Sequence, residues 1–184
     1  MKLFYVLLGA TPKGRNTEQH DVFFGIAEDV YDLRSEIIAF WKEANGKVHM
    51  DGYMEVNCID GFEVKIVDKF ENKSTENLYF LNLGGYDPNI FQELHQHLLM
   101  VETSVSKIIN RAKKTDFYKK MGFKNAESHI DDQYAVDIDD LSRVDDLLPI
   151  SMKEKYSIIL EKNEDPTLKN ELHIGYFKLK KTKI

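Results

Sequence analysis

The chain has 184 residues, with 25 Lys and Arg against 31 Asp and Glu, and so a formal net charge of −6. This length can bury a core without disulfides or metal, and 42% hydrophobic residues exclude a disordered chain. The single Cys excludes an internal disulfide framework and a Cys-rich zinc module. The acidic balance argues against nucleic acid as a partner, because binding its backbone requires clustered positive charge.

The apolar segment at residues 3–10 resembles a short signal peptide, but the sequence favours another interpretation. The segment at 78–85 repeats its pattern in mid-chain, where it cannot act as a targeting signal. We therefore expect both segments to be strands. No apolar run reaches the ~20 residues of a membrane-spanning helix, so we expect a cytoplasmic protein with no membrane partner.

An internal duplication is the most informative feature of the sequence. A shift of 75 residues aligns identical residues in the pairs Leu3/Leu78, Leu8/Leu83, Gly9/Gly84, Glu18/Glu93, His20/His95 and Val30/Val105. Further along, a shift of 80 aligns His49/His129, Asp51/Asp131, Val56/Val136 and Asp60/Asp140. Matches on both sides of one register change are hard to attribute to chance. We predict repeat units at 1–75 and 76–148 and a C-terminal β-hairpin at 149–184, together forming one compact domain.

Apolar, aromatic and β-branched runs predict the strands of the first copy. They lie at residues 2–9, 19–27, 47–59 and 62–70. Between the second and third strands, apolar residues recur at helical spacing and predict a helix at 30–44. Asp60-Gly61 predicts a two-residue hairpin turn before the fourth strand.

The second copy repeats this order and then diverges. Strands are expected at 78–84, 93–101 and 129–138, with a helix at 104–120. A short acidic helix or turn at 140–148 and strands at 156–161 and 172–179 are expected to follow. The repeated unit is thus strand–strand–helix–strand(–strand). It predicts an α+β fold with helices packed on largely antiparallel sheet and the two units related by a pseudo-twofold axis.

Four of the six histidines occupy equivalent positions in the two copies, and an Asp follows the second of each pair by two residues. The strand–helix–strand connection predicts two parallel strands, which places His20 and His49 at the same end of one sheet. Residues two apart in a strand share a face, so Asp51 is expected beside His49. The candidate cluster comprises His20, His49 and Asp51 in the first copy and His95, His129 and Asp131 in the second. Asp21 and His97 are secondary candidates.

This cluster leaves three interpretations open. The first is binding of a small molecule or a partner through the His and Asp side chains. The second is a divalent metal site of a hydrolase-type enzyme, in which the metal would activate a water molecule. The third is a structural or interaction module in which these side chains hydrogen-bond loops and a sheet edge pairs in a homodimer.

Several segments resemble an uncharacterised bacterial family described only as a domain of unknown function. The first half is carried by His20-Asp21-Val22-Phe23-Phe24-Gly25, Trp41, His49-Met50-Asp51-Gly52-Tyr53 and Ile59-Asp60-Gly61-Phe62. The second half is carried by Ala112-Lys113, Gly122-Phe123 and the run His129-Ile130-Asp131-Asp132-Gln133-Tyr134-Ala135-Val136-Asp137. The resemblance implies two related halves and a cytosolic bacterial origin. It implies no activity, cofactor, partner or catalytic residue.

Overall fold

The computed structural model describes residues 1–70, 74–122, 128–131 and 142–179. The chain divides into two compact units. Unit 1 combines Met1–Asn72 with Leu147–Ile184, and unit 2 is Lys73–Asp146. The strands pair antiparallel within each sheet and short helices accompany them, which confirms the expected α+β class.

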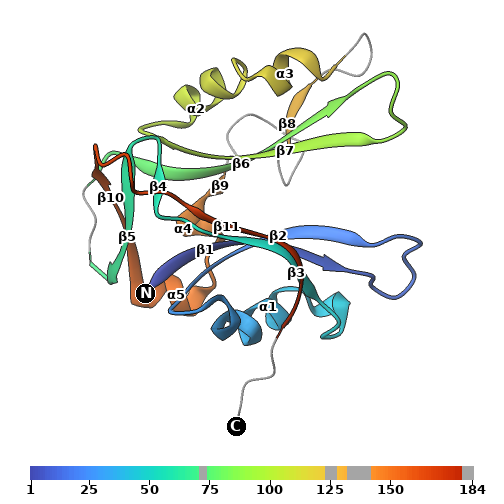
Figure 1. Ribbon diagram of the computed structural model, residues 1–184, viewed down its shortest axis with the longest axis horizontal. Helices are drawn as coiled ribbons and strands as arrows, with labels where there is room; N and C mark the ends of the chain where they lie inside the picture. Colours follow the sequence, from blue (N-terminus) through green and yellow to red (C-terminus); the bar gives the residue numbers. More distant parts are fainter. Residues whose placement is uncertain (71–73, 123–127, 132–141, 180–184) are drawn as a thin grey trace. The chain divides into compact units, whose positions relative to one another are not determined.

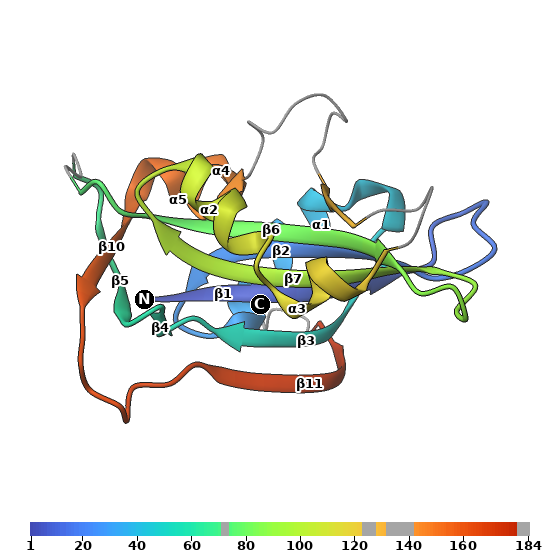
Figure 2. The same cartoon turned by 90° about the horizontal axis from the view of Figure 1, so that it is seen from above.

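The main sheet of unit 1 has the order β11-β3-β1-β2 (Figure 2). Its strands are β1 (Lys2–Ala10), β2 (Gln19–Ala27), β3 (His49–Glu55) and β11 (Glu171–Lys178). Because β1 pairs antiparallel with both β2 and β3, these two strands run parallel on either side of it, as the crossover connection predicts. The apolar character of β1 follows from its central place, with Val6 and Leu8 completely buried.

The connection between β2 and β3 is broken into three short helical segments, where the sequence predicts one helix. They are η1 (Val30–Leu33), α1 (Arg34–Phe40) and η2 (Lys42–Ala44). Asp29 caps the first segment, since its side chain accepts a hydrogen bond from the Tyr31 N–H. The interruption falls at Trp41, whose φ of −108° and ψ of 72° leave the helical region. Bulky aromatic residues favour a helix less than straight-chain residues, so the Phe40-Trp41 pair is a natural place for the break.

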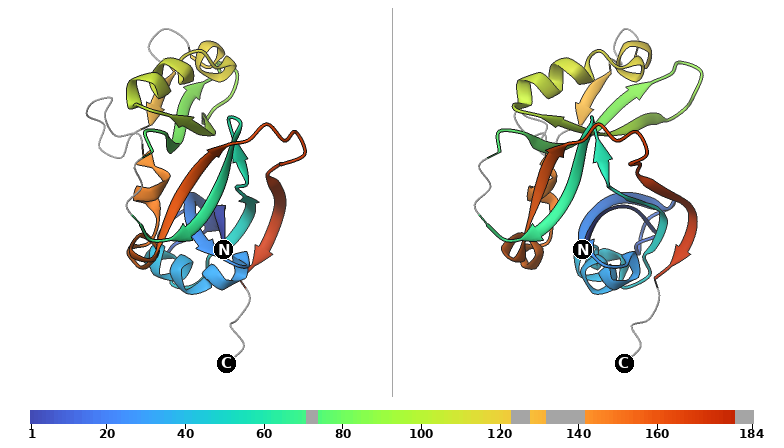
Figure 3. Two further views of the ribbon diagram at one scale, coloured as in Figure 1. Left: turned by 90° about the vertical axis from the view of Figure 1, so that its left-hand side faces the viewer. Right: turned by 60° about the vertical axis from the view of Figure 1, so that its left-hand side comes forward.

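A second sheet of unit 1 has the order β10-β5-β4 (Figure 3). Its strands are β4 (Cys58–Ile59), β5 (Phe62–Asp68) and β10 (Tyr156–Lys162), and α5 (Ile150–Lys155) leads into β10. Asp60 and Gly61 both have positive φ, of 53° and 77°, as the predicted tight hairpin turn requires.

The predicted C-terminal β-hairpin is wrong, because β10 and β11 pair with different strands. Strand β10 pairs with β5 in one sheet, whereas β11 pairs with β3 in the other. Between them, the Asn170 side-chain oxygen accepts hydrogen bonds from the N–H groups of Asn57 and Cys58. This attachment directs the chain away from β10 and toward the edge of β3.

Unit 2 contains a sheet with the order β7-β6-β8, in which β9 also pairs with β6. The strands are β6 (Asn77–Tyr86), β7 (Glu93–Glu102), β8 (His129–Asp131) and β9 (Ser142–Arg143). Helices α2 (Val105–Ala112) and α3 (Asp116–Lys120) lie along one face of this sheet (Figure 1), and α4 (Val144–Leu147) follows β9. The helix predicted at 104–120 is interrupted because Thr115 caps the start of α3. Of the strand predicted at 129–138, residues 132–138 lie outside the described part.

Candidate functional site

Gly9 near the end of β1 organises the first group of candidate residues. It lies opposite His20 on β2 and opposite His49 on β3. Residues directly opposite one another in a sheet point to the same face, so both histidines flank the position where Gly9 has no side chain. The prediction that His20 and His49 lie at one end of the sheet is confirmed.

A β-bulge brings Asp51 into the same place. Leu7 lies opposite Gly52 and Leu8 lies opposite Met50, so Asp51 has no partner on β1. A bulge of this kind bends the strand and redirects a side chain, and bulges are common beside functional sites. The pairing of β3 with β11 shifts at the same point, where Ile174 lies opposite Gly52 and Phe177 opposite Met50.

Four side chains form what we term the imidazole–carboxylate cluster: Glu18, His20, His49 and Asp51. The Nε2 of His49 lies 3.1 Å from Glu18 Oε1 and 3.2 Å from Asp51 Oδ1. The Nε2 of His20 lies 3.4 Å from Asp51 Oδ2 and 3.8 Å from Glu18 Oε2. Each carboxylate thus contacts both imidazoles, one through each oxygen. His49 is the least accessible member, with a side chain 12% exposed, whereas that of His20 is 62% exposed.

The cluster contains a polar atom without a hydrogen bond. Asp51 Oδ2 is buried and accepts no hydrogen bond from the described residues, although His20 Nε2 lies 3.4 Å away. A buried acceptor left unsatisfied typically costs about 1–3 kcal/mol. Such groups are rare in native proteins and call for an explanation such as a functional role or a bound molecule.

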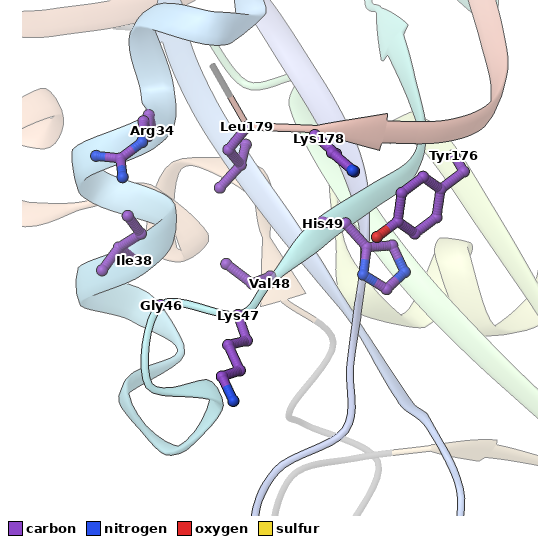
Figure 4. A pocket seen from close by; sticks show the side chains of 9 residues that line it. All are labelled: Arg34, Ile38, Gly46, Lys47, Val48, His49, Tyr176, Lys178 and Leu179. Carbon is purple, nitrogen blue, oxygen red and sulfur yellow. The ribbon is translucent and has the colours of Figure 1, made fainter. Parts of the chain in front are cut away.

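A pocket of about 230 Å³ has His49 in its lining (Figure 4). Its polar lining residues are Arg34 of α1, Lys47, His49, Tyr176 and Lys178. Its apolar lining residues are Ile38, Val48 and Leu179, and Gly46 completes the lining. Among the described residues that line the pocket, none is acidic. His49 therefore belongs to both the cluster and the pocket.

Tyr176 reaches this pocket because of the irregular pairing between β3 and β11. Gly175 and Tyr176 fall within the shift of register, and Gly175 has a φ of 144°, a backbone conformation that glycine adopts most readily. The Tyr176 and His49 rings lie 4.4 Å apart between centroids, tilted by 35°. Figure 4 shows the Tyr176 hydroxyl on the side of His49. The aromatic ring covers the imidazole and fixes one wall of the pocket.

The second group of candidate residues lies in unit 2 at the same register. Gly84 on β6 is opposite His95 on β7 and His129 on β8. In contrast to Asp51, Asp131 lies opposite a residue of the central strand, Asn82, without a shift of register. His95 Nε2 lies 3.9 Å from Glu93 Oε2. The side chains of His129 and Asp131 lie outside the described part, so the second cluster stays a prediction.

The secondary candidates make the following contacts. Asp21 Oδ1 accepts a hydrogen bond from the Val22 N–H, 2.7 Å away. His97 lies against the ring of Phe80, with 5.3 Å between centroids.

Sequence reasoning missed six residues of this site that the argument uses. Two features of the sequence could have identified Glu18: it is repeated as Glu93, and it lies two residues before His20. Gly9 was signalled in the same way by Gly84. No such signal marks the other four, because the pocket forms only when β11 pairs with β3; they are Arg34, Lys47, Tyr176 and Lys178.

The described residues were searched for a metal-binding group and for a membrane-spanning helix. Within them, no group of three or more His, Cys, Asp or Glu side chains is arranged so that it could hold a metal ion. The metal-dependent enzyme therefore stays a prediction from the sequence. No helix in the described ranges is both long and apolar enough to cross a membrane.

Comparison with known proteins places part of the chain in a family context. Residues 15–66 match the model of a Domain of Unknown Function (DUF1543). This match includes Glu18, His20, His49 and Asp51, and it confirms the resemblance to an uncharacterised domain family over residues 15–66. The search of curated proteins found no match.

A solved structure supports the fold of the whole chain. The crystal structure of a protein Il1583 from Idiomarina loihiensis is similar to this chain, with a TM-score of 0.57 and 21% sequence identity. The similarity covers 98% of this chain and 99% of that one. At this identity the likeness shows a shared fold and nothing about activity.

Proposed function

We propose that unit 1 is a small-molecule-binding module whose ligand occupies the pocket beside His49. The observation that carries the proposal is the double role of His49. Its Nε2 is held by Glu18 and Asp51, and its ring forms part of the pocket wall. An imidazole that two carboxylates hold and that also lines a pocket is well suited to contact a ligand there.

The construction around His49 supports binding over a purely structural role. A structural hydrogen-bonding group would be expected to satisfy its buried atoms, but Asp51 Oδ2 accepts no hydrogen bond from the described residues. The bulge at Asp51 and the second irregularity at Gly175–Tyr176 interrupt regular pairing at this one place. Irregular backbone that positions side chains around a pocket is typical of binding sites.

The size of the pocket limits the ligand. Its volume of about 230 Å³ is below the range of about 300–1,000 Å³ found for drug-sized ligands. The ligand is therefore a small metabolite, or one end group of a larger molecule.

The proposal is tested by binding of a fragment library to the full-length protein, followed by two-dimensional NMR. We expect fragments to shift the resonances of His49, Tyr176 and their neighbours, and His49→Gln to abolish these shifts. His173→Gln is the matched control, since His173 lies on β11 in the same sheet but stacks on Tyr53, with centroids 4.4 Å apart. Fragments that bind His49→Gln as well as the wild type, or that bind only elsewhere, would overturn the proposal.

The same variants separate the metal-dependent alternative from this proposal. A metal site predicts that ZnCl₂ raises the melting temperature of the wild type, that EDTA reverses the rise, and that His49→Gln abolishes it. Fragment binding that persists unchanged in EDTA would instead support a metal-independent ligand site.

A further inference from the structure

We propose that the ligand of the His49 pocket is a small anion with a phosphate or carboxylate group, an inference that rests on the function proposed above. The argument begins with charge. Arg34, Lys47 and Lys178 all line the pocket, and none of the described lining residues is acidic. The whole chain has six more acidic than basic residues, so this local excess of positive charge runs against its composition. A pocket lined by one sign of charge attracts ligands of the opposite sign.

Arg34 supplies a specific observation. Its Nε is buried and has no hydrogen-bond partner among the described residues. This atom is closed to solvent, so it is not the atom that a pocket ligand would meet. Arg34 as a whole is only half-buried, and for the other N–H groups of its guanidinium an anionic oxygen is the best acceptor. The planar guanidinium can also present two parallel N–H groups to a carboxylate or a phosphate.

The other pocket residues complete an anion-binding set. Lys47 precedes β3 and Lys178 ends β11, and neither forms an ion pair within the described residues. The hydroxyl of Tyr176 and the imidazole of His49 add two further hydrogen-bonding groups, from the opposite wall to Arg34 (Figure 4). The carboxylates of Glu18 and Asp51 contact Nε2 of His49 and are absent from the pocket lining, so they hold the imidazole without lining the pocket themselves.

The predicted duplication raises the question of how many such pockets each chain has. The repeat counterpart of Arg34 is Ile109, which is 8% exposed in the core of unit 2. Tyr176 and Lys178 come from β11, which pairs with β3 of unit 1. The basic pocket is therefore expected once per chain, even if the His and Asp pattern is present twice.

The test uses the full-length protein and two probes, sodium phosphate and sodium malonate, at constant ionic strength adjusted with sodium chloride. Binding is followed by NMR titration, which detects millimolar affinities. We expect at least one probe to bind at one site per chain, with shifts at Arg34, His49 and Tyr176. The stronger probe identifies the end group as phosphate or carboxylate.

Charge-removing variants decide whether the pocket is responsible. Arg34→Gln and Lys178→Gln are each expected to raise the dissociation constant about tenfold or more. Lys13→Gln removes the same charge from an exposed loop and is expected to leave it within twofold of the wild type. Lys178→Gln keeps the test decisive if Arg34→Gln fails to fold, which circular dichroism would show.

Three results would overturn the inference: no binding of either probe, equal binding by Arg34→Gln or Lys178→Gln, or an equal loss in Lys13→Gln. These results are distinct from failure of the proposed function. If neutral fragments bind at His49 while phosphate and malonate do not, the pocket is a binding site but not one for anions. If neither fragments nor anions bind, both proposals fail.

Discussion

Gly9 leaves the space that His49 occupies. A Cβ atom on Gly9 would lie only 2.5 Å from His49 Nε2, and also 2.5 Å from Asp51 Oδ2. Real Cβ contacts essentially never come this close, so His49 and an amino acid with a side chain at position 9 cannot both keep these positions. Glycine is required here for close approach, and the imidazole–carboxylate cluster is built over the bare backbone of β1.

Gly9→Ala is accordingly predicted to displace the His49 imidazole. Overpacking of this kind typically lowers the free energy of unfolding by about 1–3 kcal/mol, which urea denaturation would measure. The same variant should lose fragment and phosphate binding at the His49 pocket. Gly14→Ala is the control, since nothing lies within 4 Å of its Cβ position. It should retain binding, although its φ of 85° makes alanine strained there. Normal binding by Gly9→Ala would contradict the role assigned to this glycine.

The part of this site that sequence could predict is the part that follows from periodicity. The apolar runs predicted β2 at its observed bounds, and the crossover placed His20 and His49 at one end of a sheet. The bulge at Asp51 was not predictable, because one unpaired residue leaves no mark in the hydrophobic pattern.

The pocket was beyond sequence reasoning for a different reason. It depends on β11 adding to the edge of β3, a pairing between segments more than a hundred residues apart. The sequence favoured pairing of β10 with β11 because they are neighbours in the chain, but Asn170 attaches the intervening loop to Asn57 and Cys58. Specific long-range hydrogen bonds of this kind override the preference for local hairpins.

Asn170→Ala should therefore loosen β11 and weaken the pocket. The side chain also donates to the Cys58 carbonyl, 2.9 Å away, so the variant leaves three backbone groups without their partner. We expect a loss of about 1–3 kcal/mol in the free energy of unfolding and faster hydrogen exchange along β11, measured by mass spectrometry. Asn89→Ala, in a turn of unit 2, is the control. Unchanged exchange in β11 would show that Asn170 does not hold this strand.

The cap at Asp29 is predicted to support the segment that carries Arg34. Asp29 accepts a hydrogen bond from the Tyr31 N–H, 2.8 Å away, and its own N–H donates to Asp32. Asp29→Ala should lower the free energy of unfolding by about 1 kcal/mol, the usual cost of losing an N-cap. Glu164→Ala removes one negative charge from an exposed position and should have little effect in the same denaturation experiment. Equal losses in both variants would point to charge rather than capping.

Tyr5 gives a prediction about alkaline pH. Burial raises the pKa of Tyr5 above its ordinary value of 10.0. The unfolded chain therefore loses this proton first as the pH rises past 10. The free energy of unfolding should then fall, by roughly 1.4 kcal/mol per pH unit for one proton, whereas this contribution to stability is fully present below pH 10.

Tyr5→Phe should abolish that part of the alkaline loss while leaving the stacking on Phe24, with centroids 5.0 Å apart, in place. Urea denaturation at about pH 9 and pH 11 gives the change in the free energy of unfolding between the two pH values. This change is then compared between the wild type and the variant. Tyr176→Phe is the control, since this side chain is 64% exposed. If the wild type and Tyr5→Phe lose stability in parallel, Tyr5 ionises equally in both states.

The predicted duplication can be tested at Gly84, the counterpart of Gly9. Gly84 on β6 lies opposite His95 on β7 and His129 on β8. Gly9 has the same register with His20 and His49. If the two units build the same cluster, a Cβ at Gly84 should disturb its pair of imidazoles as Gly9→Ala disturbs the other. Histidine-selective NMR on the full chain provides the measurement. We expect Gly84→Ala to shift the imidazole resonances of His95 and His129 and to spare His20 and His49, with the reverse outcome for Gly9→Ala. If Gly84→Ala shifts the resonances of neither His95 nor His129, unit 2 has the residues of the cluster but does not bring them together. The cluster would then exist in unit 1 alone.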